Sequence, residues 1–295
     1  MRDVPVLVER CSAPSVDVVE KVFRELSLER ELKRAERVVV KLNLCGFRGW
    51  ETGATSDPRF VRAVVEYIRR AAPDKPVYLA EADATNARAS LLFKWLGFEK
   101  LAEEAGASVL NLSKGESVEV DVGYGPYGRL RVSKALLDGS FIVNLAKLKT
   151  HIITYITCSL KNVFGALYHW RKIDYHRRLD EAIVAANLAV RCGVHIVDGI
   201  IAHEGEKGPL YGRPVKLGVV VAGVEPASVD AVCARIAGFK PGRIRHIRLA
   251  SEAGLGQLSP SVLGDAPRGG LEFSTLNQVA FKFAQEVRSL FSSRR

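Results

Sequence analysis

Short apolar runs alternate with amphipathic segments along the first third of the chain. The runs at 37–42 and 76–80 have the length and β-branched content of buried strands. Segment 58–71 between them repeats its apolar residues at helical spacing, and the pair Asp57-Pro58 suits a helix start. Further strands are predicted at 4–8 and 108–112, and further helices at 16–35 and 91–105. This alternation predicts an α/β fold with a mostly parallel, twisted sheet flanked by helices.

The rest of the chain predicts a small hairpin and a second group of strands. Segments 116–122 and 130–133 flank the turn-forming stretch GYGPYG and predict an antiparallel pair within an insertion at 113–135. Strands are predicted at 141–145, 194–197 and 215–222, helices at 179–189, 229–237 and 276–290, and glycine-rich loops at 198–213 and 254–270. We find no internal repeat or linker, and therefore predict one α/β unit over residues 1–295, with a two-lobed arrangement as an alternative.

The stretch KLKTHIITYITCSLKNVFGALYHWRKIDYHRR, residues 147–178, has the most unusual pattern. At about 100° per residue, the apolar residues of segment 150–164 fall on one arc, as in an amphipathic helix. Its polar arc carries three Thr, a Ser, a Tyr, a His, a Cys, an Asn and one Lys, whereas a solvated helix face carries Glu, Lys and Arg. Threonine lowers helix propensity, so these residues are of little use on a surface. We predict a helix over 150–164 whose polar side lines a half-buried site.

The span 147–178 is also strongly basic. It holds seven Lys or Arg and three His against one acid, Asp174. We interpret it as the wall of a site for an anionic ligand, where free N–H groups at a helix start near Thr150 or His151 would add to the attraction. The alternative is a helix lying under a loop, with its hydroxyl groups bonded to backbone carbonyls.

Polar residues that follow the predicted strands are the candidate site residues, because ligands of open α/β sheets bind outside the carboxyl ends of the strands. The candidates for binding a small carboxylate or phosphate substrate are Lys41, Asn43, Thr55, Lys147, Lys149, Lys161 and Asn162. Three or four charge-assisted hydrogen bonds of about 1.5–3 kcal/mol each would suffice for roughly micromolar binding. For Lys41, an ordinary surface lysine is the alternative.

Histidine is the candidate acid–base residue, because its pKa lies near neutrality. We choose His151 first and His176 second as catalytic residues of an enzyme whose reaction the sequence does not name. His169, which stands between Tyr168 and Trp170, and His246 are interpreted as structural.

A divalent metal is a further candidate cofactor. Glu81, Asp198 and Glu204 follow predicted strands and could either orient the lysines or bind such a metal, together with His203. Their spacing matches no recognised metal motif. Asp198 has the alternative of shaping a turn before Gly199.

The five cysteines are scattered and form no C-x-x-C pair, which argues against a disulfide framework and against an iron–sulfur or zinc motif contained in this sequence. Cys158 could act as a nucleophile, with a buried, unreactive thiol as the alternative. The isolated G-x-G pieces match neither a dinucleotide-binding fingerprint nor a P-loop.

The formal net charge of +10 over 295 residues suits an anionic substrate or a nucleic acid. It also suits a thermophilic lineage, because only three Gln and seven Asn accompany many Arg, Glu and Lys. A nucleic-acid or ribosome-binding role would use the span 147–178 with Arg243, Arg245 and Arg248. We do not favour it, because the lysines are interleaved with Thr and Asn, whereas single-stranded nucleic acid is held on aromatic rings.

The first residues, MRDVPVLVER, have no apolar leader character, and no apolar run approaches the roughly 20 residues of a membrane-spanning helix. We therefore expect a cytoplasmic protein with no membrane partner.

Several of these segments resemble one known family. They are VVVKLNL (38–44), TSDPRFVRAVVEYI (55–68), LAEAD (79–83), NLAKLKTHIITYITCSLKNVFGAL (144–167), DGIIAHEGEKGPLYGRP (198–214) and VDAVCARIAGF (229–239). Over about 37–256 the chain resembles domain-of-unknown-function family 362. The resemblance implies an association with ferredoxin-like domains that carry four-iron clusters, and hence a redox role. Because this sequence lacks the cysteine run for such a cluster, an iron–sulfur protein would be a separate partner, which makes a redox accessory a third hypothesis.

Overall fold

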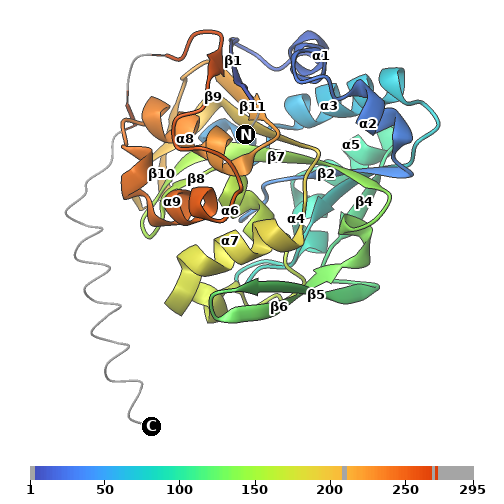
Figure 1. The fold of residues 1–295 in the computed structure, drawn as a ribbon. Coiled ribbons are helices and arrows are strands. Elements are labelled where there is room, and N and C mark those ends of the chain that lie inside the picture. The colour runs from blue at the N-terminus through green and yellow to red at the C-terminus, as the bar shows by residue number, and fades with distance from the viewer. Residues whose placement is uncertain (1–3, 208–210, 268–269, 272–295) are drawn as a thin grey trace.

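The computed structural model describes residues 4–207, 211–267 and 270–271 (Figure 1). The strands of the main sheet are β1 (Val6–Arg10), β2 (Arg37–Lys41), β3 (Val77–Glu81), β4 (Ser108–Asn111), β7 (Ser140–His151), β8 (Tyr155–Thr157), β9 (Val194–Lys207), β10 (Tyr211–Val215), β11 (Val219–Gly223) and β12 (Val262–Leu263). A separate hairpin consists of β5 (Ser117–Tyr124) and β6 (Tyr127–Ser133). The α-helices are α1 (Val16–Glu25), α2 (Glu29–Arg34), α3 (Pro58–Ala71), α4 (Ala89–Trp95), α5 (Phe98–Glu104), α6 (Ser159–Phe164), α7 (Leu179–Ala189), α8 (Pro226–Ile236) and α9 (Arg245–Glu252).

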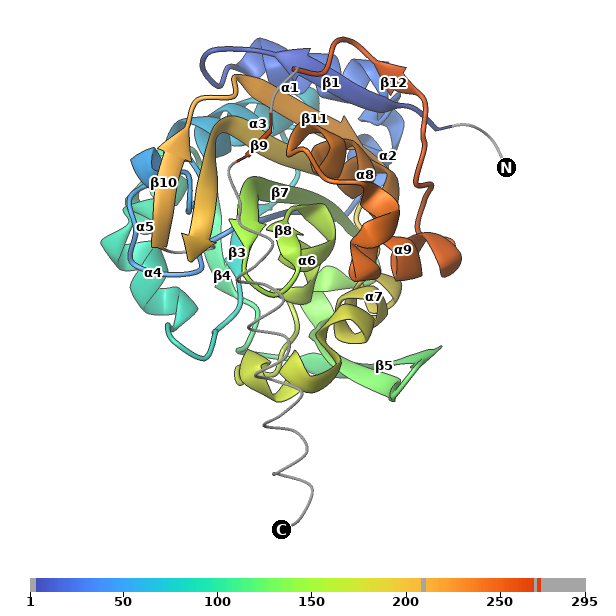
Figure 2. The ribbon, with the colours of Figure 1, turned by 90° about the vertical axis from the view of Figure 1, so that its left-hand side faces the viewer.

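The main sheet has the order β12-β1-β11-β9-β7-β2-β3-β4, with β10 paired to β9 and β8 paired to β7. The strands from β9 through β7, β2 and β3 to β4 run parallel, and β11 is antiparallel to both of its neighbours. Figure 2 shows the sheet twisting through the molecule, with the long β9–β10 hairpin extending from one side. The predicted α/β fold with a mostly parallel sheet is confirmed.

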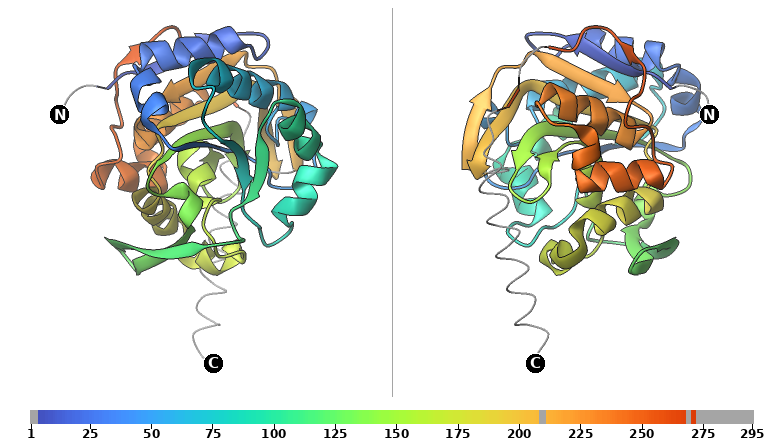
Figure 3. Two further views of the ribbon diagram at one scale, coloured as in Figure 1. Left: turned by 90° about the vertical axis from the view of Figure 1, so that its right-hand side faces the viewer. Right: turned by 60° about the vertical axis from the view of Figure 1, so that its left-hand side comes forward.

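Helices cover both faces of this sheet, as the two sides of the molecule in Figure 3 show. Alternate residues of β2 point to opposite faces: Val38 and Val40 join the core under α1 to α5, and Val39 joins the core under α6 to α9. Both cores are apolar and fully buried along the central strands. A strand buried on both faces reads as a continuous apolar run, which is why 37–42 could be recognised as a strand.

The predicted antiparallel hairpin is confirmed as β5–β6, which lies outside the main sheet and packs against α7 (Figure 1). Gly123, near the end of β5, and Gly125, in the turn, both have positive φ, a conformation that glycine adopts at little cost. The hairpin extends the second core through Leu130 and Val132, which are buried.

The helix predicted over 150–164 is wrong. Strand β7 continues from Ser140 to His151, residues 152–154 turn, and β8 runs back antiparallel to β7 before α6 begins at Ser159. The apolar residues of this segment are buried or half-buried, but a hairpin followed by a short helix buries them. The branched Thr and Ile side chains that lower helix propensity favour this extended backbone.

Four further elements differ from those predicted. The loop predicted at 198–213 is formed largely by β9 and β10, and the strand predicted at 215–222 begins only at Val219. The helices predicted at 16–35 and 91–105 are each broken in two by a residue with positive φ, Ser27 and Gly97. The predicted helix at 276–290 lies outside the described residues. Among the described residues, no helix has the length and apolar composition needed to cross a membrane.

Candidate functional site

The candidate site lies where the sheet changes its direction of growth. From β2 the chain adds β3 and β4 on one side, and then returns to place β7 on the other side of β2. Ligands of open α/β sheets bind at the carboxyl ends of the strands at such a switch point. The carboxyl ends of β2 and β7 carry residues 41–43 and 147–151, so the fold brings these two polar segments side by side.

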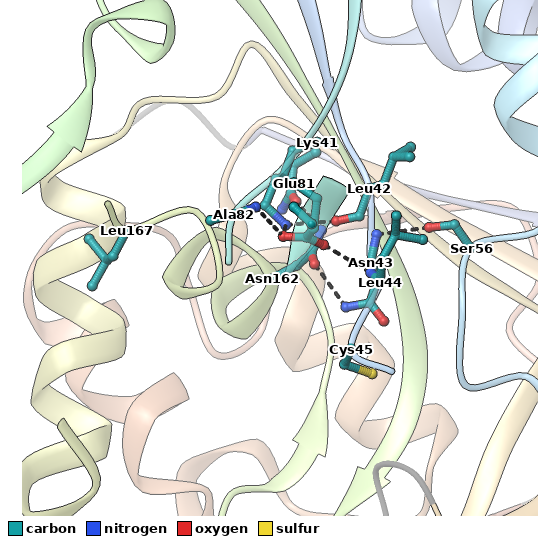
Figure 4. Close-up of polar contacts among 12 residues, drawn as sticks. Lys41, Leu42, Asn43, Leu44, Cys45, Ser56, Glu81, Ala82, Asn162 and Leu167 are labelled. Carbon is teal, nitrogen blue, oxygen red and sulfur yellow. Dashed lines mark hydrogen bonds and ion pairs between the residues drawn. The ribbon is translucent and has the colours of Figure 1, made fainter. Parts of the chain in front are cut away.

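Three asparagines and a lysine form a buried chain of hydrogen bonds at this point, named here the Asn–Lys network (Asn43, Asn144, Lys149 and Asn162). Lys149 Nζ donates to Asn43 Oδ1 at 2.7 Å. Asn43 Nδ2 donates to Asn162 Oδ1 at 2.8 Å (Figure 4). Asn162 Nδ2 donates in turn to Asn144 Oδ1 at 2.7 Å. The network therefore fixes the ends of β2 and β7 relative to α6.

A second layer of buried polar groups supports α6. The Asp230 carboxylate accepts hydrogen bonds from the backbone N–H groups of Ser159 (2.8 Å) and Leu160 (3.1 Å), the first two residues of that helix. Burial raises the pKa of Asp230 to about 8, against the two N–H donors, which lower it. His195 Nδ1 lies 2.6 Å from Ser159 Oγ and 2.9 Å from Asn144 Nδ2, and burial lowers the pKa of His195 to about 3. These groups position α6 and are closed off from solvent.

Lys149 is held by three acceptors within the protein. Its Nζ lies 2.7 Å from Asn43 Oδ1, 2.8 Å from the carbonyl oxygen of Ala54 and 3.1 Å from Cys45 Sγ. An ammonium group has three N–H donors, so these contacts use all of them. Among the described residues, no carboxylate forms an ion pair with Lys149. Its position is fixed, while its charge is not compensated by any carboxylate in the described part of the chain.

Two other predicted lysines are neutralised by buried carboxylates. Lys41 Nζ lies 2.7 Å from Glu81 Oε1, and the two side chains are 2% and 7% exposed (Figure 4). Lys147 Nζ lies 2.8 Å from Asp198 Oδ2 in an equally buried pair. Lys41 is thus not a surface lysine, and Asp198 lies within β9 and not in a turn. We assign both pairs to holding the strand ends, not to holding a ligand.

The three carboxylates predicted to orient the lysines or to bind a metal lie in three different ion pairs. Glu81 pairs with Lys41 and Asp198 with Lys147, while Glu204 Oε1 accepts from Arg213 Nε at 2.9 Å. In the described part of the chain, no group of three or more His, Cys, Asp or Glu residues is arranged to hold a metal ion. The prediction of a metal at these three residues is therefore not supported by their arrangement, whereas their role in orienting the lysines fits for Glu81 and Asp198.

Lys161 differs from the other three predicted lysines. It lies on α6 and is partly exposed, and its ammonium group forms no hydrogen bond or ion pair with another described residue. Its Nζ stands 5.9 Å from the centre of the Phe164 ring. Burial of its ammonium group, followed by the charge of Lys149, lowers the pKa of Lys161 from 10.5 to about 8, and only Cys45 acts in the opposite direction. A cation that is partly desolvated and lacks a carboxylate is the group that a bound anion would stabilise.

Both predicted catalytic histidines lie in the electrostatic field of Lys161. His151 ends β7, and its Nδ1 accepts hydrogen bonds from the backbone N–H groups of Ile153 (3.1 Å) and Thr154 (3.3 Å). Burial, then Lys161 and Lys149, lower the pKa of His151 well below its ordinary value. Burial and then Lys161 also lower the pKa of His176, which is half-buried in the 3-10 helix η3 (Lys172–Arg178). Both imidazoles are therefore neutral at pH 7.

Two polar groups near the network have no hydrogen-bond partner among the described residues. Thr55 Oγ1, a predicted ligand contact, is buried in the loop before α3. His203 Nε2 is also buried without a partner, while His203 Nδ1 donates to the carbonyl oxygen of Thr52 at 2.7 Å. Cys45, whose thiol lies beside Lys149, was not among the predicted site residues. Its position two residues after Asn43, just beyond a strand end, was the available signal.

The features of the alternative hypotheses are largely accounted for by internal contacts. Arg245 Nη2 lies 2.7 Å from Glu181 Oε1, and Arg248 pairs with Glu252 at 2.7 Å, so two of the three arginines predicted for nucleic-acid binding are already paired.

Cys158 is fully buried, and burial raises the pKa of its thiol well above the ordinary value. This fits the unreactive alternative. His169 pairs with Asp174 at 2.7 Å and His246 is buried, as expected of structural residues.

Comparisons with known proteins identify a family. The family model described as "Domain of unknown function (DUF362)" matches residues 38–235, which confirms the resemblance seen in the sequence. A thylakoid-associated protein of Synechocystis sp. is 32% identical over 136 residues, which cover 44% of this chain and 42% of that protein. The chain thus spans less than half the length of this curated relative.

Two solved structures are similar at low identity. The lactate racemase apoprotein from Thermoanaerobacterium thermosaccharolyticum has 12% identity and a TM-score of 0.47, over 80% of this chain and 58% of that one. A protein from Thermotoga maritima has 10% identity and a TM-score of 0.45, over 79% of this chain and 61% of that one.

Proposed function

This chain belongs to the family of domain of unknown function DUF362, and we propose that it is an enzyme that binds a small anionic substrate, a carboxylate or a phosphate, beside Lys161. The observation that carries the proposal is a positive charge that no carboxylate of the described residues compensates. Lys149 and Lys161 act on each other, and no carboxylate among the described residues forms an ion pair with either. Two such cations cost free energy when they are close together and partly desolvated, and a bound anion would offset that cost.

The two lysines would have different tasks in this site. Lys149 has its three donors bound to the protein, so it contributes charge from a fixed position. Lys161 is free to donate directly to the anion. With a pKa of about 8, it is mostly an ammonium ion at pH 7. The Asn–Lys network keeps this arrangement rigid before the substrate binds, which reduces the ordering cost of binding.

The histidines supply the proton chemistry of the proposal. Since His151 Nδ1 accepts from two backbone N–H groups, the ring proton is on Nε2, and His151 acts as a hydrogen-bond donor to the substrate. A proton acceptor must be neutral at working pH, and the lowered pKa of His176 keeps it so. We therefore assign the general-base role to His176 and a donor role to His151.

The direct test is to remove the charge of Lys161 without removing its length. Oxalate and inorganic phosphate, titrated by calorimetry into the wild type and into Lys161→Met, probe the two substrate classes. One charge-assisted hydrogen bond contributes about 1.5–3 kcal/mol, so the variant should bind the preferred anion at least tenfold more weakly. Lys161→Arg should retain binding.

A matched control is Lys100→Met, which removes a lysine whose side chain is 82% exposed on α5. It should bind as the wild type does. Equal anion binding by wild type and Lys161→Met would disprove the assignment. If Lys161→Met instead binds the anion more weakly, native mass spectrometry of the protein purified from its own host identifies the natural anion as a mass lost on denaturation. This mass should be absent from Lys161→Met.

A further inference from the structure

A cavity of about 1120 Å³ lies at the carboxyl ends of β3 and β4. Its walls are the loops after these two strands, part of β6, residues 168–175 and Phe47 from the loop after β2. None of its lining residues belongs to the Asn–Lys network, and Lys161 does not line it. It is therefore a separate site at the same edge of the sheet, where ligands of open α/β sheets bind.

Aromatic rings form much of the wall of this cavity. Trp170 is 52% exposed, a large area for an indole ring to leave in water. Tyr168 carries the Arg131 guanidinium over its ring at 5.5 Å, and Tyr127 and Tyr175 lie with their ring centres 5.7 Å apart. Exposed rings and guanidinium planes in one cavity offer surfaces on which a flat, aromatic ligand stacks.

Three cations also line the cavity: Arg88, Lys114 and Arg131. All three are exposed, and within the described chain none of them forms an ion pair with a carboxylate. They come from the loops after β3 and β4 and from the hairpin, so they surround the cavity from different elements. Such cations are suited to phosphate oxygens.

The cavity also contains a buried carboxylate, Asp83. Its Oδ1 accepts from the backbone N–H of Ala89 (2.8 Å) and from Asn111 Nδ2 (2.9 Å), so the group is held in place. Both donors use Oδ1, which leaves Oδ2 without a hydrogen-bond donor among the described residues. A carboxylate oxygen in that state accepts from hydroxyl groups and repels phosphates.

We propose that this cavity binds a free nucleotide. Its base would stack on Trp170 and Tyr168, and a ribose hydroxyl would donate a hydrogen bond to the Asp83 carboxylate. Its phosphates would be held by Arg88, Lys114 and Arg131. The combination of aromatic rings, unpaired cations and one fixed carboxylate matches the three chemical parts of a nucleotide. A nucleic-acid strand fits less well, because its repeated phosphates would pass the carboxylates of Asp83 and Asp174. The proposal does not rest on the site at Lys161.

The test is calorimetric titration with ADP as the probe. Wild type should bind ADP, and Trp170→Leu and Arg131→Gln should each bind it at least tenfold more weakly. Arg129→Gln is the matched control, because Arg129 is an exposed arginine of the same strand that does not line the cavity. It should bind ADP as the wild type does. Lys161→Met should also leave ADP binding unchanged, which separates this proposal from the first.

The ribose contact has its own readout. Wild type should bind 2′,3′-dideoxy-ADP at least fivefold more weakly than ADP, and Asp83→Asn should lose most of that preference. Absence of ADP binding at millimolar concentration, or equal binding by wild type, Trp170→Leu and Arg131→Gln, would overturn the proposal. So would an eight-residue oligoadenylate that binds these same residues more tightly than ADP.

Discussion

Lys161 combines two properties that are rarely found together in a structural lysine. It is partly desolvated, and it has no anionic partner among the described residues. Lys41 and Lys147 are more deeply buried, but each has a carboxylate within 2.8 Å. A buried ammonium group is normally paired because desolvation of an isolated charge is costly. The contrast among lysines of one site is the physical reason for placing the ligand at Lys161.

The pH dependence of anion binding follows from the lowered pKa of Lys161. In the free protein, the ammonium form is lost as pH rises through about 8, so affinity for oxalate should fall roughly tenfold between pH 7 and pH 9. Oxalate is fully ionised over this range, and the histidines with lowered pKa values stay neutral. Calorimetry at several pH values measures the change. Lys161→Arg should show flat affinity, and a flat profile in the wild type would mean that Lys161 does not bind the anion.

The lowered pKa of Lys161 also makes the folding stability of the protein depend on pH. The unfolded chain binds the Lys161 proton more tightly than the folded one, since the pKa is about 8 in the fold and 10.5 without it. Stability from this group therefore rises with pH between about 8 and 10.5, and it is lowest below pH 8. A ligand that binds the ammonium form removes part of this penalty.

Glu81→Gln should destabilise the protein strongly, because it leaves the Lys41 ammonium buried without a carboxylate. Breaking one partner of a buried ion pair costs about 3–5 kcal/mol, and Glu81 also accepts a hydrogen bond from the Leu44 backbone. Urea denaturation followed by circular dichroism measures the loss. Glu116→Gln, which breaks an exposed pair with Lys134, is the control and should leave the midpoint unchanged. A similar midpoint for both variants would contradict a structural role for the Lys41–Glu81 pair.

At the scale of elements, local sequence patterns predicted the regular parts well. Helix α3 was found because Asp57 caps it and Pro58 occupies its first turn, and these two signals need no tertiary context. The prediction of a helix over 150–164 is wrong because the apolar residues of the β7–β8 hairpin and of α6 have the same spacing as one face of a helix. Burial of Lys147 and Lys149 within β7 also concealed the strand, since charged residues normally mark its end.

Ser27 offers a test of where a predicted helix is broken. It is exposed and has a φ of 56° between α1 and α2, a conformation that costs a residue with a Cβ about 1–2 kcal/mol. Ser27→Gly removes this strain but gains unfolded-state entropy, so the net effect should be a stabilisation of about 0.5 kcal/mol. Ser27→Ala keeps the strain and should give no gain. Thermal unfolding of the three proteins decides this, and a less stable glycine variant would contradict it.

At the scale of the whole molecule, the sequence could indicate which residues are polar at strand ends but not which of them meet. Asn43 and Asn162 are 119 residues apart, and their hydrogen bond depends on the order of β2 and β7 in the sheet. Ion pairing also depends on the whole fold. Lys41 and Lys147 form ion pairs, Lys149 donates to three neutral acceptors, and the Lys161 ammonium has no partner among the described residues. The separate cavity could not be predicted, because its rings and cations come from Phe47 and from segments 83–91, 113–131 and 168–175.

The net charge of +10 also suits nucleic-acid binding, and the salt dependence of binding tests this rival hypothesis. Much of the positive charge is already paired with acids, as for Arg245 and Arg248, and three unpaired cations line the cavity. Binding of a single strand falls with salt by about 0.7 per phosphate neutralised on a log–log scale, so three contacts predict a slope of only about −2. Fluorescence anisotropy of a 20-nucleotide RNA between 50 and 300 mM salt measures it. A slope of about −5 or steeper would require a much larger basic surface, and would favour nucleic acid over a small anion as the partner of this charge.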